Sequence, residues 1–242
     1  MSIDLLTQVV VFLTIFFAIF TQSVAGFGLA LVSMPILAGI IGIRNATPLI
    51  VLVAILAEVI LLFRYRNEIN VKAVWRMIVA GMIGIPLGVI ALKRLDERII
   101  LTVLGVLIVL YAVYALLNLR LPSLEGNSWP FGFGFISGVL GGAYNIAGPL
   151  VIVYGDCRKW QPKEFKGNLQ GYFLLGSVIA VISHALAQNF SREIFNLYLL
   201  SIPAIVLGLI AGLSLDKYVN QVIFRKVVLV GLVIAGIRLV VG

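Results

Sequence analysis

The sequence has little charge and few reactive side chains. Only 12% of its 242 residues are Asp, Glu, Lys or Arg, against about 25% in soluble globular domains. Hydrophobic residues make up 62%, where soluble domains have about 45–50%. A chain with so little polar surface does not fold as a soluble globule. This excludes a soluble catalytic domain, a large extramembrane module and a nucleic-acid-binding protein.

The chain has a single cysteine, Cys157, which excludes an intrachain disulfide and any paired-cysteine metal or redox motif. The first residues, Met1 to Asp4, contain no Lys or Arg, so we expect no cleavable signal peptide and a first apolar stretch that stays in the protein. No charged block or Ser/Gly linker marks a second domain. We therefore predict one membrane domain over residues 1–242, and we attribute the excess of 18 Lys and Arg over 10 Asp and Glu to membrane-flanking loops.

Stretches without charge predict eight hydrophobic units, because an ionised side chain at mid-bilayer costs at least ~2.5–3.5 kcal/mol. The first unit, Leu5 to Ile43, would form a helix of roughly 58 Å against a hydrocarbon core of ~30 Å. The fifth unit, Gly126 to Gly155, is also too long. We expect an all-α polytopic membrane protein in which these two units are broken, at Thr21–Gly28 and at Gly141–Pro149.

The two predicted breaks lie at matching places in the chain. Aligning Gly28 with Gly142 also aligns Pro35 with Pro149, an offset of 114 residues. We interpret the chain as two homologous halves, about 1–119 and 127–242, each opening with a broken helix. Hydrophobic segments interrupted by glycine or proline at corresponding positions of two halves are typical of a transporter binding site.

Two membrane topologies are consistent with the loop charges. If every unit crosses once, 11 Lys and Arg lie on one side and 7 on the other. If each broken unit enters and leaves by one face, the counts are 12 and 6, and the halves are inverted repeats. We favour the inverted arrangement because a broken hairpin in each half supplies two opposed half-helix ends.

A helix break inside the bilayer directs free backbone N–H groups and the positive end of a helix dipole at the cavity, which favours an anion. Neutral polar side chains add further donors. The residues that we predict to bind substrate are Gln22, Ser23, Gly26, Gly28, Gly142, Tyr144, Asn145 and Gly148. The alternative for the glycines is close packing of helices.

Two titratable residues lie inside apolar units. Glu58 and His184 are candidates for proton coupling. The alternatives are that Glu58 pairs with Arg64 near the interface and that His184 is an ordinary interfacial residue.

Four polar residues follow the broken units and are candidates for attracting anions, although positive-inside charge also explains the basic ones. They are Arg44, Lys166, Asn168 and Gln170.

The glycine motifs carry a resemblance to a known family. Ala25-Gly26-Phe27-Gly28 followed by Pro35, and Gly138-x-x-Gly141-Gly142 followed by Gly148-Pro149, resemble the TauE/SafE sulfite exporter family of four-plus-four permeases. The resemblance covers essentially the whole chain. It implies export or uptake of sulfite, sulfonates or related small organic anions across a prokaryotic plasma membrane, with no cofactor. We predict no metal site.

Two other functions remain open from the sequence. One is a transporter of a different small organic anion or of a metal ion. The other is an intramembrane enzyme that pairs a serine with His184, but the chain has no Gly-x-Ser-x-Gly motif to carry a nucleophile. We therefore predict a transporter rather than an enzyme, with the lipid bilayer and a small anion as its partners and with the oligomeric state left open.

Overall fold

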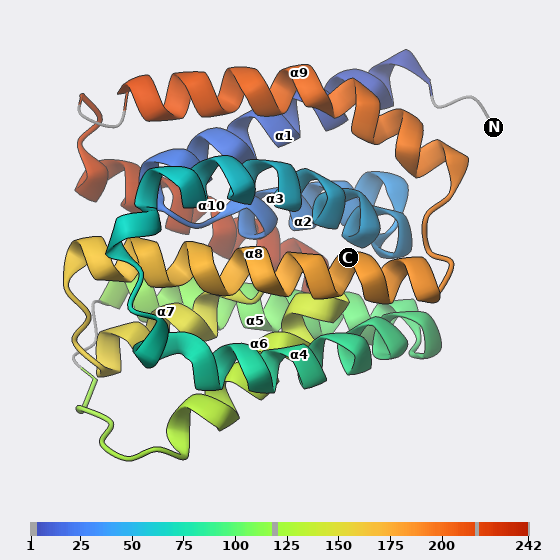
Figure 1. Ribbon diagram of the computed structural model, residues 1–242. Helices are drawn as coiled ribbons and strands as arrows, with labels where there is room; N and C mark the ends of the chain where they lie inside the picture. Colours follow the sequence, from blue (N-terminus) through green and yellow to red (C-terminus); the bar gives the residue numbers. More distant parts are fainter. Residues whose placement is uncertain (1–3, 118–120, 216–217, 242) are drawn as a thin grey trace. The chain divides into compact units, whose positions relative to one another are not determined.

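Helices make up almost all of the chain that the structure describes. The computed structural model describes residues 4–117, 121–215 and 218–241. In these residues it contains ten α-helices, one short 3-10 helix and no β-strand (Figure 1). The prediction of an all-α fold is confirmed. The helices are α1 (Leu5–Ala25), α2 (Leu29–Ile41), α3 (Ile43–Tyr65), η1 (Arg66–Glu68), α4 (Val71–Arg94), α5 (Glu97–Leu117), α6 (Trp129–Tyr144), α7 (Gly148–Cys157), α8 (Pro162–Leu186), α9 (Arg192–Leu215) and α10 (Gln221–Val241).

Among the described residues, six helical segments are long and apolar enough to cross a bilayer, which requires about 20 apolar residues. They contain α1, α3, α4, α5, α8 and α9. The helices α2 and α7 are apolar but shorter, with 13 and 10 residues. Each of these short helices directly follows a non-helical interruption of an apolar stretch.

The helices form two units, which we describe one at a time. Unit 1 comprises Met1–Val53, Leu95–Leu119 and Phe190–Gly242, and unit 2 comprises Ala54–Arg94 and Arg120–Asn189. Each unit therefore combines helices from both predicted halves of the chain. The predicted end of the first half, residue 119, lies outside the described residues.

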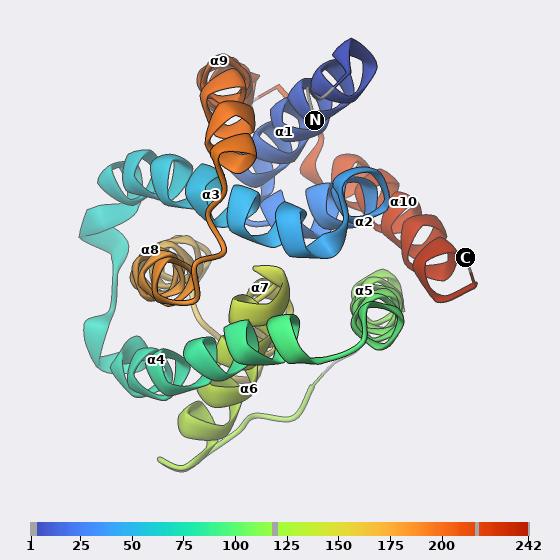
Figure 2. The same ribbon diagram turned by 90° about the vertical axis from the view of Figure 1, so that its right-hand side faces the viewer.

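In unit 1 the first helix packs against the ninth, and α5 packs against α10. Gly208 of α9 lies against Phe16 and Ile19 of α1, and Gly212 lies one turn further along against Phe20 and Ser23. The contacts move along both helices in the same direction, so α1 and α9 run parallel. Figure 2 shows the two helices side by side. The absence of side chains at the two glycines allows the backbones to approach closely.

Unit 2 contains a second parallel pair, α4 and α6, in which the helices meet backbone to backbone. Gly134, Gly138 and Gly142 of α6 face Met77, Gly81 and Ile85 of α4 in turn. A Cβ atom placed on Gly138 would lie 2.5 Å from the carbonyl oxygen of Gly81. The small-residue ridge of α6 is therefore a helix-packing surface.

The chain reverses at two short connections of three residues. Residues 26–28 join α1 to α2, and residues 145–147 join α6 to α7. In each case the two helices pack against one another, so the second helix returns along the first. These connections are the interruptions of the two overlong apolar stretches.

The alignment of Gly28 with Gly142 is wrong as a positional equivalence. The helices α2 and α7 begin at Leu29 and Gly148, 119 residues apart, and α3 and α8 begin at Ile43 and Pro162, also 119 apart. At this offset Gly142 corresponds to Ser23. The two glycines have different structural roles, because Gly28 allows a turn whereas Gly142 allows α6 to contact α4. The position of a glycine in the sequence does not distinguish these two roles.

Candidate functional site

The first break depends on two glycines with left-handed backbone. Gly26 caps α1 with φ of 83°, and Gly28 precedes α2 with φ of 121°. Residues with a Cβ atom rarely adopt these angles. A Cβ on Gly28 would also lie 3.0 Å from Cγ2 of Thr21. The chain can therefore end one helix and start the next within three residues.

Gln22 connects the two sides of this break. Its side chain is only 3% exposed, and its Oε1 accepts a hydrogen bond from the backbone N–H of Leu29 at 3.2 Å. The first N–H groups of a helix have no partner within the helix, so Gln22 caps α2 from the preceding helix. Its Nε2 is buried and has no hydrogen-bond partner. A free amide donor is thus held at the positive end of α2, where an anion is favoured.

Ser23 is directed at a neighbouring helix. Its hydroxyl donates to the carbonyl of Ile19 at 2.8 Å, and its Cβ lies against Gly212 of α9. These contacts give Ser23 a packing role in the α1–α9 interface. Its predicted substrate contact stays a prediction.

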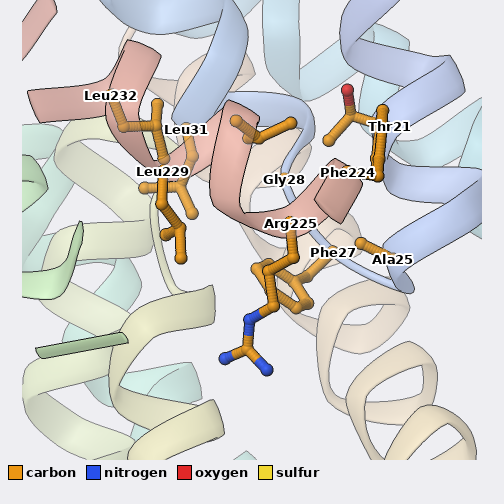
Figure 3. A pocket seen from close by; sticks show the side chains of 10 residues that line it. Thr21, Ala25, Phe27, Gly28, Leu31, Phe224, Arg225, Leu229 and Leu232 are labelled. Atoms are coloured by element: carbon orange, nitrogen blue, oxygen red, sulfur yellow. The ribbon is translucent and has the colours of Figure 1, made fainter. Parts of the chain in front are cut away.

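A pocket lies beside the first break and contains a charged residue that the sequence analysis did not single out (Figure 3). The guanidinium of Arg225, from α10, lies over the ring of Phe27 with 5.9 Å between Cζ and the ring centroid. In the sequence Arg225 resembles any basic residue at the start of a helix, so only the packing of α10 on α2 and α1 reveals it. The pocket is lined by Thr21, Ala25, Phe27, Gly28, Leu31, Phe224, Arg225, Val228, Leu229 and Leu232.

The second break lies in unit 2 and uses an asparagine where the first uses Gly26. Asn145 caps α6 with φ of 54°, a left-handed conformation that asparagine tolerates better than most residues. Tyr144 ends α6 and is buried, and Gly148 begins α7. The hydroxyl of Ser137 donates to the carbonyl of Ala147 at 2.9 Å. The break is therefore held by bonds from α6 itself.

Gly142 and His184 lie close together in unit 2. A Cβ on Gly142 would overlap the backbone of Ile85 in α4, which is a packing constraint. The imidazole of His184 lies near the backbone of Gly142, and its Nδ1 faces Nδ2 of Asn189 at 2.9 Å. His184 is fully buried. The structure thus brings the only histidine of the chain to the helix that carries the second break.

Glu58 is buried within α3, with 5% of its surface exposed. Its carboxyl group shares a hydrogen bond with Ser177 of α8, and its Oε2 atom has no partner. Arg64, the partner considered from the sequence, lies over the ring of Tyr65 instead. A buried carboxyl with one neutral partner is an expensive group to retain for packing alone.

The four residues predicted to attract anions have structural contacts. Arg44 donates to the carbonyl of Leu95 at 3.1 Å, and Nζ of Lys166 lies 5.8 Å from the ring centroid of Tyr65. Oδ1 of Asn168 accepts from the backbone N–H of Asn70 at 2.8 Å, while its buried Nδ2 has no partner. Gln170 lies two residues after Asn168 on α8 and is fully buried.

The predicted substrate residues therefore form two groups. Gln22, Gly26 and Gly28 meet at the first break, in unit 1, and Tyr144, Asn145 and Gly148 meet at the second, in unit 2. Among the described residues, no group of three or more His, Cys, Asp or Glu side chains is placed to hold a metal ion.

These features define a class of protein, a helical membrane protein with several spans and two backbone breaks. The chain matches the family model described as Sulfite exporter TauE/SafE over residues 11–239. It belongs to this family and is a multi-pass membrane transporter, as the resemblance of the glycine motifs predicts. Comparisons with curated proteins and with solved structures found no match.

Proposed function

We propose that the chain is a secondary transporter of small, sulfur-containing anions such as sulfite or organosulfonates. The observation that carries this proposal is the buried amide of Gln22, whose Nε2 has no partner and stands at the first turn of α2. Helix N-termini and neutral N–H donors bind oxyanions without a permanent positive charge in the bilayer. The family membership of the chain supports the choice of sulfur oxyanions.

We further propose that the two halves are inverted repeats around this site. The 119-residue spacing of α2 from α7 and of α3 from α8 supports two copies of one unit. The helix pairing also supports it. The first helix of each half packs against a helix of the other half, α1 against α9 and α6 against α4. If each break forms a hairpin that returns to its own face, the three helices α3, α4 and α5 separate the hairpins. An odd number of crossings puts the second hairpin on the opposite face.

The proposed cellular setting is the plasma membrane of a prokaryote. In the inverted arrangement 12 Lys and Arg lie on one side and 6 on the other. We assign the richer side to the cytoplasm because cytoplasmic loops carry an excess of Lys and Arg. We propose Glu58 and His184 as the groups that couple proton movement to transport. We also propose that the chain is not an enzyme.

Flux into proteoliposomes tests the proposal. We expect saturable uptake of labelled sulfite, thiosulfate or ethanesulfonate by liposomes that contain the protein, with competition among these anions. Uptake no faster than in empty liposomes would contradict the proposal. Saturable uptake of a divalent metal ion, uncompeted by sulfite, would favour the alternative of a metal-ion transporter.

A further inference from the structure

The pocket beside the first break is an apolar hollow. Phe27 and Leu31 form the wall on the side of the break and α2, and Leu229 with Leu232 forms the wall on the side of α10 (Figure 3). Thr21 directs its hydroxyl to the carbonyl of Phe17 at 2.8 Å. Its methyl group faces Gly28 instead. The neutral residues of the lining therefore supply hydrophobic surface at the point where α2 begins.

Among the described residues that line this pocket, Arg225 alone is charged. Figure 3 shows its side chain leaving α10 and passing the ring of Phe27. That ring is held in place by an edge contact with Tyr111, with 6.2 Å between centroids. Arg225 is exposed, and within the part of the chain described its one ring, ionic or hydrogen-bonding interaction is with this ring. Its hydrogen-bond donors are free for a ligand.

A guanidinium in this position suits an oxyanion. It is planar and weakly hydrated, and it can donate two parallel hydrogen bonds to one sulfonate, sulfite or carboxylate group. Because Phe27 is the middle residue of the break, an anion held on Arg225 lies beside the ring at the centre of that break.

We propose that Arg225 and Phe27 form a docking site for a free small oxyanion, which passes from there to the first break. This inference rests on the proposed function and adds a residue that binds the anion before the buried amide of Gln22 does. Arg225 on this account determines affinity rather than the rate of the translocation step.

The test compares two neighbouring cations. Arg225→Gln removes the proposed ligand, while Lys226→Gln removes the same charge one residue along α10, outside the pocket lining. We measure the Kd for sulfite and for methanesulfonate by calorimetry in detergent, and KM and maximal rate in proteoliposomes. Loss of a charged hydrogen-bond pair predicts a rise of about tenfold or more in Kd and KM for Arg225→Gln, at unchanged maximal rate. Lys226→Gln is expected to stay within about twofold of wild type, because exposed charges without a bound partner contribute little.

The outcomes separate this inference from the proposed function. Saturable flux with equal KM in wild type and Arg225→Gln would overturn the docking site and leave the transporter intact. Anion binding that depends on Arg225 without any flux would support the docking site and contradict the transport function. Absence of both binding and flux would contradict both. If Arg225→Gln does not fold, Arg225→Lys, which keeps the charge but loses the planar fork, is expected to raise KM by about threefold, and an unchanged KM would overturn the inference.

The lipid composition distinguishes a free anion from a lipid headgroup. The same variants are compared in liposomes of phosphatidylcholine alone and in liposomes that also contain phosphatidylglycerol. We expect the KM effect of Arg225→Gln in both. An effect confined to liposomes with the anionic lipid would overturn the inference, because it would assign Arg225 to lipid phosphate.

Discussion

The oxygen and the nitrogen of the Gln22 carboxamide have different structural roles. The oxygen caps α2 through the N–H of Leu29, and the nitrogen is buried without a partner. A polar residue in a long apolar stretch could be predicted to have a role from the sequence. The capping bond could not, because it joins residues seven apart across a break whose path depends on two left-handed glycines.

Other single residues show the limits of pattern alone. Ser23 and Gly142 lie near the breaks, and the structure adds a helix-packing contact for each, to Gly212 and to Ile85. Their predicted contacts with substrate stay predictions. Arg225 lies nearly 200 residues from Phe27 in the chain and touches its ring. Contacts of this kind follow from how helices pack, which local sequence does not encode.

Glu58 gives the residue-scale prediction. Glu58→Gln keeps an oxygen that can accept from Ser177 but removes the titratable proton. We expect the variant to fold and to lose acceleration of anion flux by an imposed pH gradient, while exchange of anion at equal pH continues. The measurement is initial flux in proteoliposomes with and without the gradient. Ser177→Ala, which leaves the carboxyl group in place, is the control and should keep the pH dependence.

If Glu58→Gln retains full acceleration by the pH gradient, then Glu58 is structural. Flux with and without the pH gradient is also measured for His184→Gln, which tests the second residue proposed for proton coupling. The ring of His184 faces Asn189 and the backbone of Gly142.

At the scale of elements, each break lies next to a close contact between two parallel helices. The ridge of α6 meets α4 at Gly134, Gly138 and Gly142, and the last turn of α6 leads directly into the second break. In unit 1, Gly212 of α9 meets α1 beside Ser23, three residues before the first break begins. Each break is therefore anchored by a close contact with a helix from the other predicted half.

The α4–α6 interface gives the element-scale prediction, which compares two glycines of one helix. A Cβ on Gly138 would meet the backbone of Gly81 at 2.5 Å, whereas a Cβ on Gly132 meets nothing within 4 Å. Backbone atoms cannot move aside as a flexible side chain can. We expect Gly138→Ala to destabilise the protein by about 1–3 kcal/mol and Gly132→Ala to be neutral or slightly stabilising. Thermal unfolding in detergent measures both, and equal melting temperatures would contradict the packing account.

The breaks themselves were predictable as elements because an apolar stretch too long for one crossing must be interrupted, and glycine marks where. Their alignment was not predictable in the same way. Glycines at the first break allow positive φ, while those of α6 allow close approach, and the same letter in the sequence led to an offset of 114 instead of 119. The helix boundaries correct the offset because they depend on backbone geometry.

At the scale of the whole molecule, composition alone predicted an all-helical membrane protein. The scarcity of charge gave the class, and the positions of the charges gave the connections between helices. The topology relative to the bilayer depends on whether each broken unit crosses or returns, and the loop charges of 12 against 6 and of 11 against 7 differ too little to decide. The topology is therefore the prediction to test at this scale.

Single cysteines in a Cys157→Ser background test it. Asn67, Gln161 and Asp96 are exposed and lie in three different connections. The inverted arrangement places residues 67 and 161 on one side of the membrane and residue 96 on the other. We expect an impermeant thiol reagent, added to intact cells, to label Asp96→Cys and to spare Asn67→Cys and Gln161→Cys. Labelling of Asn67→Cys together with protection of Gln161→Cys and Asp96→Cys would support a single crossing by every unit and contradict inverted repeats.

We propose that polar groups at each of the two helix breaks bind the transported anion. The most direct measurement is the initial rate of labelled sulfite flux in proteoliposomes for wild type, Gln22→Leu and Asn145→Leu, with Asn145→Gly to preserve the left-handed backbone of that residue. The account predicts saturable flux in wild type, and a rise in KM of about tenfold for each leucine variant that folds. Saturable flux of wild-type affinity in Gln22→Leu and Asn145→Leu would contradict it.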